Sequence, residues 1–396
     1  MIYSMNFMKY ILTIALLFLL AVLGVQALEV PGDLNGDKVV SVEEVAAAEK
    51  LVQEGKLSAD EVEEIKHIHK KYPISITDSE NRTITIYKPI EKTIILHTTG
   101  YEPLLVLGAQ NKLAAVTSTA KELYSYVPGM SNKTTIGAYN EIDYEKVIES
   151  KPDIVLAYRC KPEVEEKLKL ADIPIFVLKF SETDKFDKEF RILADLLEKE
   201  DRADEFISWR NDYLYQITTQ TKAIDPKIKV FIATGNGPWG SSTNGSNSHD
   251  TVTAAGGYNI ASEISGEYGG VTVDPEWVIK MNPEIVIAEA WVEGEPPSNL
   301  TGYNMKSPDN AKQYLETLYR NEVLKETSAG KNGRIYIFHG PILLGSCSSP
   351  IGICYCAKWF YPEVFKDLNP DDINKEYFEK WLGAPYKGVW GYPTDS

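Results

Sequence analysis

The chain is poor in cysteine, in histidine and in positive charge, and each shortage excludes a class of protein. Its 396 residues include 4 Cys and 5 His, and 41 basic residues stand against 57 acidic ones, giving a net charge of −16. Four cysteines are too few for a disulfide scaffold. The acidic balance disfavours nucleic acid as a partner, because neutralising phosphates requires clustered Lys and Arg. A hydrophobic fraction of 43% excludes general disorder, and the length predicts two or three domains.

The sequence also lacks a Gly-x-Ser-x-Gly motif, the turn that carries the nucleophile of many hydrolases. Catalytic bases are scarce, because two of the five histidines, His67 and His69, lie in the leading segment. We therefore expect a protein that is not an enzyme. An extracellular hydrolase stays as a weaker alternative, since Ser, His and Asp all occur, as at His249-Asp250.

One long apolar run stands near the N-terminus. It extends from Ile11 to Val25 after Lys9, and it ends in Val25-Gln26-Ala27. A positive start, an apolar stretch of this length and small residues at its end predict a secretory signal over residues 1–27, cleaved after Ala27. An uncleaved anchor helix is the alternative, although the run is short for a bilayer span of about 20 residues. Both place the remainder outside the cytoplasm, at the outer face of the cytoplasmic membrane.

The four cysteines are Cys160, Cys347, Cys354 and Cys356. In an extracytoplasmic compartment they could form disulfides, but their connectivity cannot be deduced from the sequence. The spacing of Cys354 and Cys356 is too tight for a typical zinc knuckle, so we interpret all four as structural or free thiols. A soft-metal site in the stretch from Gly345 to Tyr355 is a minor alternative.

A small acidic module precedes the main body, and residues 33–44 have the ligand spacing of an EF-hand calcium loop. The usual Gly at its sixth position is Lys38, which must adopt a positive φ. Apolar residues at helical spacing follow over 42–52 and 58–70, so we expect a helical EF-hand-like module over 28–72 with a structural Ca²⁺. An acidic helix start with Asp and Ser caps is the alternative. The predicted ligands are Asp33, Asn35, Asp37, Val39 (through its carbonyl), Ser41 and Glu44.

The same loop resembles the first repeat of a dockerin module. A dockerin carries two such loops, and the second half here has no Asp-x-Asn-x-Asp. This departure argues against cohesin binding and favours a single calcium-stabilised helical pair that acts as a spacer.

An internal repeat organises the main body. Residues 143–157, DYEKVIESKPDIVLA, match residues 274–288, DPEWVIKMNPEIVIA, at an offset of 131. Each copy predicts a short amphipathic helix, a turn at Pro, and a strand that is apolar at every position, as in parallel sheets buried on both faces. A period this long indicates two similar lobes rather than a solenoid.

Alternating strands and helices predict an open parallel sheet in each lobe. Between the lobes, Lys185–Ala223 has a helical pattern with no Gly or Pro, which predicts one long linking helix. The fold class is therefore α/β, with two Rossmann-like lobes over 73–184 and 224–396 joined by a linking helix over 185–223.

The main body of the chain resembles the solute-binding proteins of ABC importers, the class that carries cobalamin, iron–siderophore, haem or related metal complexes. The resemblance covers about residues 74–390, and the order and spacing of the motifs are specific although each motif alone is weak. It implies two α/β lobes that hold the ligand in the cleft between them, with little hinge motion. The motifs are Ile76-Thr77-Asp78-Ser79, Thr83–Ile86, Pro89-Ile90-Glu91-Lys92-Thr93-Ile94, Leu107-Gly108-Ala109, Ile136-Gly137, Glu145…Lys151-Pro152-Asp153-Ile154-Val155, Gly256-Gly257-Tyr258-Asn259 and Glu276…Asn282-Pro283-Glu284.

The resemblance also implies partners and a site. Glu145 and Glu276 stand where such proteins present one carboxylate per lobe to arginines on the two permease subunits. Helix capping is the alternative for this region, but it explains Asp143 and Asp274 better than the glutamates. By motif alignment, the residues expected to line the ligand cleft are Thr98, Thr99, Tyr101, Tyr139, Tyr158, Arg159, Trp239, Tyr268 and His339.

The sequence departs from the family pattern in one respect that concerns the membrane. Leu23-Gly24-Val25 has Val where a lipobox requires Cys, so we expect no lipid anchor. The resulting hypothesis is a monomeric, extracytoplasmic solute-binding protein that delivers a metal complex to an ABC permease and its ATPase. A calcium-dependent surface adhesion protein is the alternative from a different class. Cobalamin, a ferric chelate, haem and an oxyanion such as molybdate all stay open as ligand.

Overall fold

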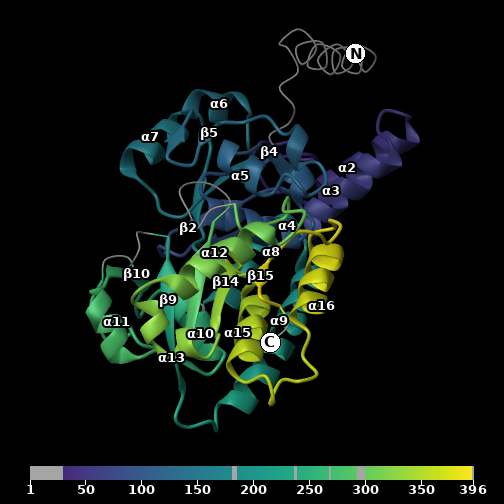
Figure 1. Ribbon diagram of the computed structural model, residues 1–396. Coiled ribbons are helices and arrows are strands. Elements are labelled where there is room, and N and C mark those ends of the chain that lie inside the picture. Colours follow the sequence, from purple (N-terminus) through teal and green to yellow (C-terminus); the bar gives the residue numbers. More distant parts are fainter. Residues whose placement is uncertain (1–29, 181–184, 236–238, 267–268, 292–298, 395–396) are drawn as a thin grey trace, which may run out of the picture. The chain divides into compact units, whose positions relative to one another are not determined.

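A computed structural model describes residues 30–180, 185–235, 239–266, 269–291 and 299–394 (Figure 1). The predicted secretory signal over 1–27 lies outside these residues. The chain divides into two units, Met1–Pro89 and Ile90–Ser396. The boundary falls after the first β-hairpin, which thus belongs to the leading unit and not to the N-terminal lobe as the sequence predicted. Among the described residues, no helix combines the length and the apolar character needed to cross a membrane.

The leading unit consists of two helices and a hairpin, α2 (Val42–Gln53), α3 (Ala59–Lys71), β1 (Ile74–Thr77) and β2 (Thr83–Ile86). Each helix begins with a capping box, Ser41 with Glu44 and Ser58 with Glu61, in which each partner caps the other's backbone N–H. Val62, Ile65 and Ile68 form the buried stripe of α3. Lys38 has a φ of 68°, which confirms the positive φ expected at the sixth loop position.

The N-terminal lobe is built on a parallel sheet of order β4-β3-β7-β8. Val147, Val164 and Leu168 pack from helices against strand residues Ile94 and Val155. The strands are β3 (Thr93–Ile95), β4 (Leu113–Ala115), β7 (Ile154–Ala157) and β8 (Ile175–Val177), with a small β5 (Gly137–Ala138) and β6 (Glu141–Ile142) hairpin apart; the helices are α4 (Tyr101–Val106), α5 (Ser118–Leu123), α6 (Tyr144–Glu149) and α7 (Pro162–Leu170).

The C-terminal lobe has a larger sheet of order β12-β10-β9-β13-β14-β15, with β11 also paired to β9. Its central strands are parallel as predicted, whereas β10, β12 and β15 pair antiparallel at the edges. The strands are β9 (Ile228–Thr234), β10 (Gly240–Ser242), β11 (Gly257–Asn259), β12 (Gly270–Thr272), β13 (Ile285–Ala290), β14 (Ile335–His339) and β15 (Gly391–Tyr392); the helices are α10 (Asn247–Ala254), α11 (Pro275–Met281), α12 (Asp309–Arg320), α13 (Ser328–Lys331), α14 (Gly340–Leu343), α15 (Ser349–Phe360) and α16 (Pro370–Glu376).

The prediction of a single linking helix over 185–223 is wrong. The segment forms two helices, α8 (Phe186–Leu197) and α9 (Glu200–Thr221), because Glu198 adopts a left-handed backbone with φ 57°. The two helices run antiparallel: the Phe190 ring lies 5.2 Å from the Phe206 ring, and the buried Arg210 lies 3.6 Å from Asp187. The left-handed turn at Glu198 is thus stabilised by tertiary packing.

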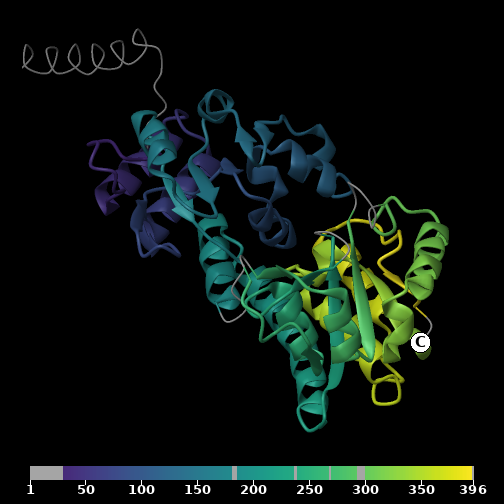
Figure 2. The ribbon, with the colours of Figure 1, turned by 60° about the vertical axis from the view of Figure 1, so that its left-hand side comes forward.

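The longer helix α9 joins the lobes, as Figure 2 shows in teal beside the green and yellow C-terminal lobe. At its start, Arg202 donates to the carbonyl oxygen of Val106 at 2.6 Å and to that of Trp381 at 3.0 Å. Further along, α9 packs on α15 of the C-terminal lobe. One helix therefore contacts both lobes.

Candidate functional site

The two copies of the repeat have the same local structure, and each presents one glutamate to solvent. In the N-terminal lobe, Asp143 caps α6 by accepting from the backbone N–H of Glu145 at 3.2 Å. In the C-terminal lobe, Asp274 caps α11 by accepting from the backbone N–H of Glu276 at 2.7 Å. Both glutamates are exposed, and neither side chain has an ion-pair or hydrogen-bond partner within the described part of the chain. The caps therefore account for the aspartates and leave the glutamates available.

The two helices also end alike. Lys151 and Asn282 occupy equivalent positions, and both adopt a left-handed backbone, with φ 48° and 49°. Two residues later, Asp153 accepts from the backbone N–H of Lys92 at 2.8 Å, and Glu284 accepts from that of Lys229 at 3.1 Å. In each lobe, the turn that follows the repeated helix is thus fixed near the start of the first strand.

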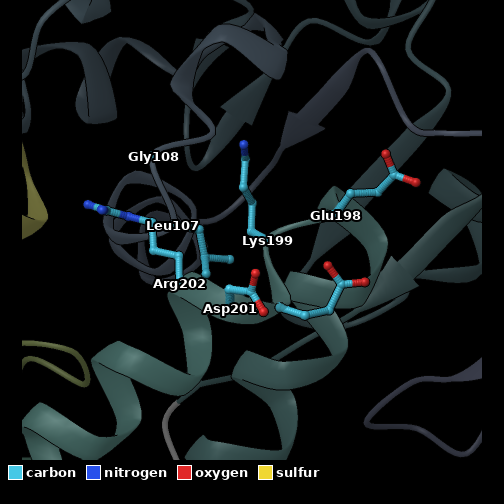
Figure 3. Close-up of a pocket in the computed structure, with 7 residues that line it drawn as sticks. Leu107, Gly108, Glu198, Lys199, Asp201 and Arg202 are labelled. Carbon is cyan, nitrogen blue, oxygen red and sulfur yellow. The ribbon is translucent and has the colours of Figure 1, made fainter.

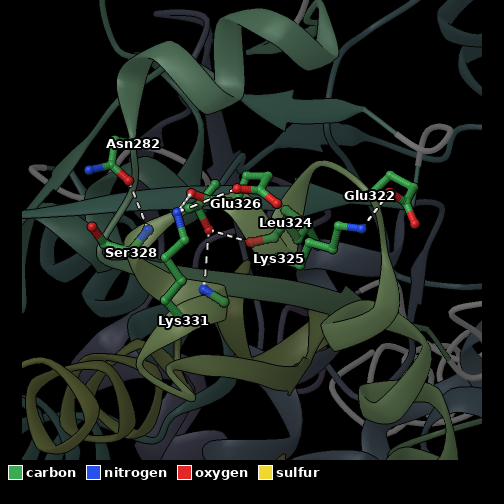
Figure 4. Close-up of polar contacts among 9 residues, drawn as sticks. Asn282, Glu322, Leu324, Lys325, Glu326, Ser328 and Lys331 are labelled. Atoms are coloured by element: carbon green, nitrogen blue, oxygen red, sulfur yellow. Dashed lines mark hydrogen bonds and ion pairs between the residues drawn. The ribbon is translucent and has the colours of Figure 1, made fainter.

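In the C-terminal lobe a further set of contacts supports α11 (Figure 4). The Asn282 side chain accepts from the backbone N–H of Ser328 at 2.8 Å. Lys331 donates to the Glu326 carbonyl at 2.7 Å, and Lys325 pairs with Glu322. The bond of Asn282 holds the end of α11 against the segment that includes α13, and the other two contacts lie within that segment.

The predicted cleft residues of the N-terminal lobe come together around His97, which follows β3. The His97 ring lies 4.9 Å from the Tyr158 ring and 6.3 Å from the Tyr139 ring, and the Arg159 guanidinium lies 5.9 Å from the Tyr158 ring. Burial, with a smaller contribution from the Arg159 charge, lowers the pKa of His97. The Nδ1 atom of His97 accepts from the backbone N–H of Thr99 at 3.3 Å, so the neutral ring carries its proton on Nε2 as a donor.

The position of Tyr139 depends on a glycine. Gly137 has a φ of 94°, and a Cβ there would lie 2.2 Å from the Glu141 carbonyl oxygen, so the hairpin of β5 and β6 requires glycine. The hairpin leaves Tyr139 51% exposed beside His97. The exposed Arg159 and Tyr139 are therefore the most accessible polar groups of this cluster.

Two further predictions in this lobe have different outcomes. Thr98 and Thr99 start a short 3₁₀ helix over Thr98–Gly100 and are half-buried, with the Thr99 hydroxyl donating to the Lys179 carbonyl at 3.3 Å. Tyr101 is fully buried in the core, which corrects its assignment to the cleft. Its hydroxyl donates to the Ile95 carbonyl at 2.7 Å and accepts from the Thr117 backbone at 2.8 Å, so its hydrogen bonds serve the lobe itself.

In the C-terminal lobe the predicted residues are less concentrated. Trp239 is half-buried and packs against the core of the lobe. His339, at the end of β14, is buried, lies 5.0 Å from the Trp390 ring and bonds the Thr301 hydroxyl at 3.0 Å. Burial lowers the pKa of His339 to about 3, so its ring is neutral. Tyr268 lies outside the described residues.

Sequence reasoning missed Glu289 and Trp291 at the carboxyl end of β13. Glu289 is 3% exposed, and its Oε1 atom has no hydrogen-bond partner among the described residues. Burial raises the pKa of Glu289 to about 7. Gly340 makes room for both side chains, because a Cβ there would lie 2.9 Å from the Trp291 ring and 3.1 Å from Glu289. One acidic residue inside an otherwise apolar strand was the available signal.

A polar link also joins the lobes. The half-buried Glu102 of α4 accepts from the Tyr377 hydroxyl at 2.6 Å, and burial raises its pKa while hydrogen bonds from Ser348 and from the backbone of Cys347 oppose that rise. Nearby, the Tyr126 and Tyr303 rings stack at 4.4 Å across the lobes. These contacts agree with the expectation of little hinge motion, which we keep as a prediction.

The remaining candidates are less informative. All four cysteines are free thiols, and within the described ranges no three or more His, Cys, Asp or Glu are arranged to hold a metal.

In the leading loop, Asp33 accepts from the backbone of Gly36 and Lys38 at 2.8 Å. A hollow at the α8–α9 turn is lined by charged side chains of both signs (Figure 3); its residues are Leu107, Gly108, Glu198, Lys199, Glu200, Asp201 and Arg202.

Comparison with known proteins gives consistent matches. The sequence profile described as periplasmic binding protein matches residues 94–341. An uncharacterised ABC transporter substrate-binding lipoprotein of Bacillus subtilis, YvrC, is 24% identical over 306 residues, covering 75% of this chain and 88% of its own. The molybdate-binding protein MolA of Haemophilus influenzae is 21% identical over 343 residues, covering 79% and 92%.

Among solved structures, the chain is similar to the TroA-like periplasmic binding protein FepB from Veillonella parvula. The TM-score is 0.69 at 22% identity, with 81% of this chain and 99% of that chain covered. At this level of identity the likeness shows the fold: two lobes with parallel sheets, as predicted from the sequence.

Proposed function

The chain belongs to the periplasmic binding protein family, and from this premise we propose that it captures a metal complex between its lobes and delivers it to a membrane permease. Membership makes it a solute-binding component of an ABC transporter and not an enzyme. The relatives act outside the cytoplasm, which supports the extracytoplasmic location predicted here. The ligand class is our inference: an iron–siderophore, cobalamin or haem type of complex.

The cluster around His97 is the observation that carries this inference. Arg159 offers a planar guanidinium fork, and the neutral His97 offers an N–H, so both groups favour anionic oxygens. The rings of Tyr139 and Tyr158 offer flat faces for a planar or chelated ligand. A free oxyanion needs donors but few rings. The rings therefore favour a complex, although MolA, a relative, is named for binding molybdate.

Native mass spectrometry of the protein purified from its own host tests this proposal. We expect an adduct that contains a metal and an organic chelator or macrocycle, together with its absorption band. Arg159→Gln should weaken rebinding of that isolated compound roughly tenfold or more, since charge-assisted hydrogen bonds contribute about 1.5–3 kcal/mol. Arg191→Gln, a substitution of an exposed arginine on α8 paired with Asp204, is the matched control. An adduct of bare oxyanion would reject the proposed ligand class.

We further propose that the permease recognises Glu145 and Glu276. Their exposure, their lack of partners among the described residues and their equivalent positions support a contact with a two-fold symmetric partner. Since two related lobes already supply two docking points, a monomer suffices.

A structural Ca²⁺ in the leading loop is a separate proposal. All six candidate ligands are oxygen atoms, which Ca²⁺ prefers, and Lys38 has the backbone conformation that the loop requires. Asp33 and Glu44 are 6% and 7% exposed, so their carboxylates lie within the loop rather than in solvent. Bound Ca²⁺ would neutralise part of the charge there.

A further inference from the structure

Each of the two repeated helices, α6 and α11, exposes an isoleucine on the same face as its glutamate. Ile148 on α6 is 37% exposed and Ile279 on α11 is 38% exposed. Each follows its glutamate by three residues, a spacing that makes two side chains neighbours on a helix. Isolated exposed apolar residues are common and need no explanation. Here, however, the same residue type is exposed to the same extent at the same place in both lobes.

The buried neighbours show that this exposure is a property of the two helices and not of loose packing. Val147 and Val278, one residue earlier in each copy, are fully buried. The helix ends are fixed by the left-handed residues Lys151 and Asn282. Both isoleucines are therefore held outward by well-anchored helices.

The exposed and half-buried positions of α6 and α11 show which surface residues the two lobes have in common. Glutamate and isoleucine recur in both copies. At the other exposed or half-buried positions the residues differ: Tyr144 against Pro275, Lys146 against Trp277, Glu149 against Lys280, and Ser150 against Met281. A partner with two equal halves can make equal contacts only with side chains that both lobes present.

We propose that Ile148 and Ile279 are the apolar half of the docking surface, each inserting beside its glutamate into an apolar recess on one half of the permease dimer. This inference rests on the proposed docking of the glutamates. The partner that fits the surface is a two-fold dimer whose halves each present a cation next to an apolar pocket. The glutamates then supply steering and register, and the isoleucines supply contact area that excludes water from the ion pair.

The test is ATPase stimulation of the cognate permease–ATPase complex in nanodiscs, titrated with variants of the full protein. Ile148→Ser/Ile279→Ser should raise the concentration for half-maximal stimulation at least about tenfold, which corresponds to about 1.4 kcal/mol. Each single substitution should give roughly half of that effect on a logarithmic scale. Leu170→Ser is the matched control, because Leu170 is 85% exposed on α7 and has no equivalent in the repeat. Melting temperature and ligand affinity should stay as in wild type.

The salt dependence of stimulation distinguishes the contribution of the glutamates from that of the isoleucines. The defect of Glu145→Gln/Glu276→Gln should shrink at high salt, where the Debye length falls to about 3 Å at 1 M, whereas the defect of the isoleucine variant should persist. Wild-type stimulation by the isoleucine variant, with loss of stimulation by the glutamate variant, would overturn the inference and leave glutamate docking intact. If both variants stimulate normally, the docking proposal fails as well. An isoleucine variant that loses ligand affinity would also overturn it.

Discussion

At the scale of single residues, burial and not sequence position decides what each predicted side chain does. Motif alignment assigns both Tyr101 and Tyr139 to the ligand cleft, but Tyr101 uses its hydroxyl inside the core and only Tyr139 is exposed. Motif alignment places a residue along the chain and says nothing of the direction of its side chain. Glu289 was missed for the same reason. A single acidic residue in an apolar strand does not show from the sequence alone whether its side chain is buried.

Glu289 leads to a prediction about pH. Its pKa is about 7 in the folded protein against an ordinary value of 4.5, because burial disfavours the charge. As pH rises from 4.5 towards 7, the unfolded chain releases this proton while the folded chain keeps it, so this group's contribution to stability falls. Glu289→Gln should therefore raise the melting temperature at pH 8 and have little effect at pH 5. The gain in unfolding free energy is on the order of 3 kcal/mol at most.

Differential scanning calorimetry at the two pH values measures this effect. Glu276→Gln, an exposed substitution in the same lobe, is the control for the loss of a carboxylate. Equal shifts of melting temperature at pH 5 and pH 8 for Glu289→Gln would show that the buried charge is not the cause.

At the scale of elements, local patterns predicted most of the structure, and long-range packing accounts for the failures. The repeat predicted α6, β7, α11 and β13, and even the shared N-caps follow from Asp143 and Asp274. The turn between α8 and α9 could not be predicted, because no Gly or Pro marks it and Glu198 adopts a left-handed backbone only within packed helices. Likewise, the antiparallel edge strands β10 and β12 are short and polar, and carry a weak pattern.

The calcium loop gives a prediction at this scale, since two capping boxes of the same design stand in one unit. Glu44→Gln and Glu61→Gln should each destabilise their helix by only about 0.3–1 kcal/mol, because glutamine still completes the capping box but lacks the negative charge that favours a helix N-terminus. Only Glu44→Gln should also abolish the rise in melting temperature that Ca²⁺ produces, because only Glu44 belongs to the proposed ligand set. Thermal unfolding with Ca²⁺ and with a chelator measures both. A wild-type protein whose melting temperature is the same in both conditions would contradict the calcium proposal.

At the scale of the whole molecule, the fold class and the two-lobed plan could be predicted, and the ligand could not. The plan depends on repeated features such as parallel strands, which leave a pattern in the sequence. The ligand of such a fold depends on side chains from several loops, whose arrangement is set by the entire fold. The polar link of Glu102 with Tyr377 is likewise visible only when the lobes are assembled.

The account's central claim is that this two-lobed protein delivers its ligand by docking two equivalent glutamates on a two-fold permease. The most direct measurement is ATPase stimulation of the reconstituted transporter by Glu145→Arg/Glu276→Arg, with ligand affinity measured on the same preparation. We predict that stimulation is abolished, because two attractions become repulsions, while ligand affinity is unchanged. Stimulation equal to that of the wild-type protein would contradict the claim.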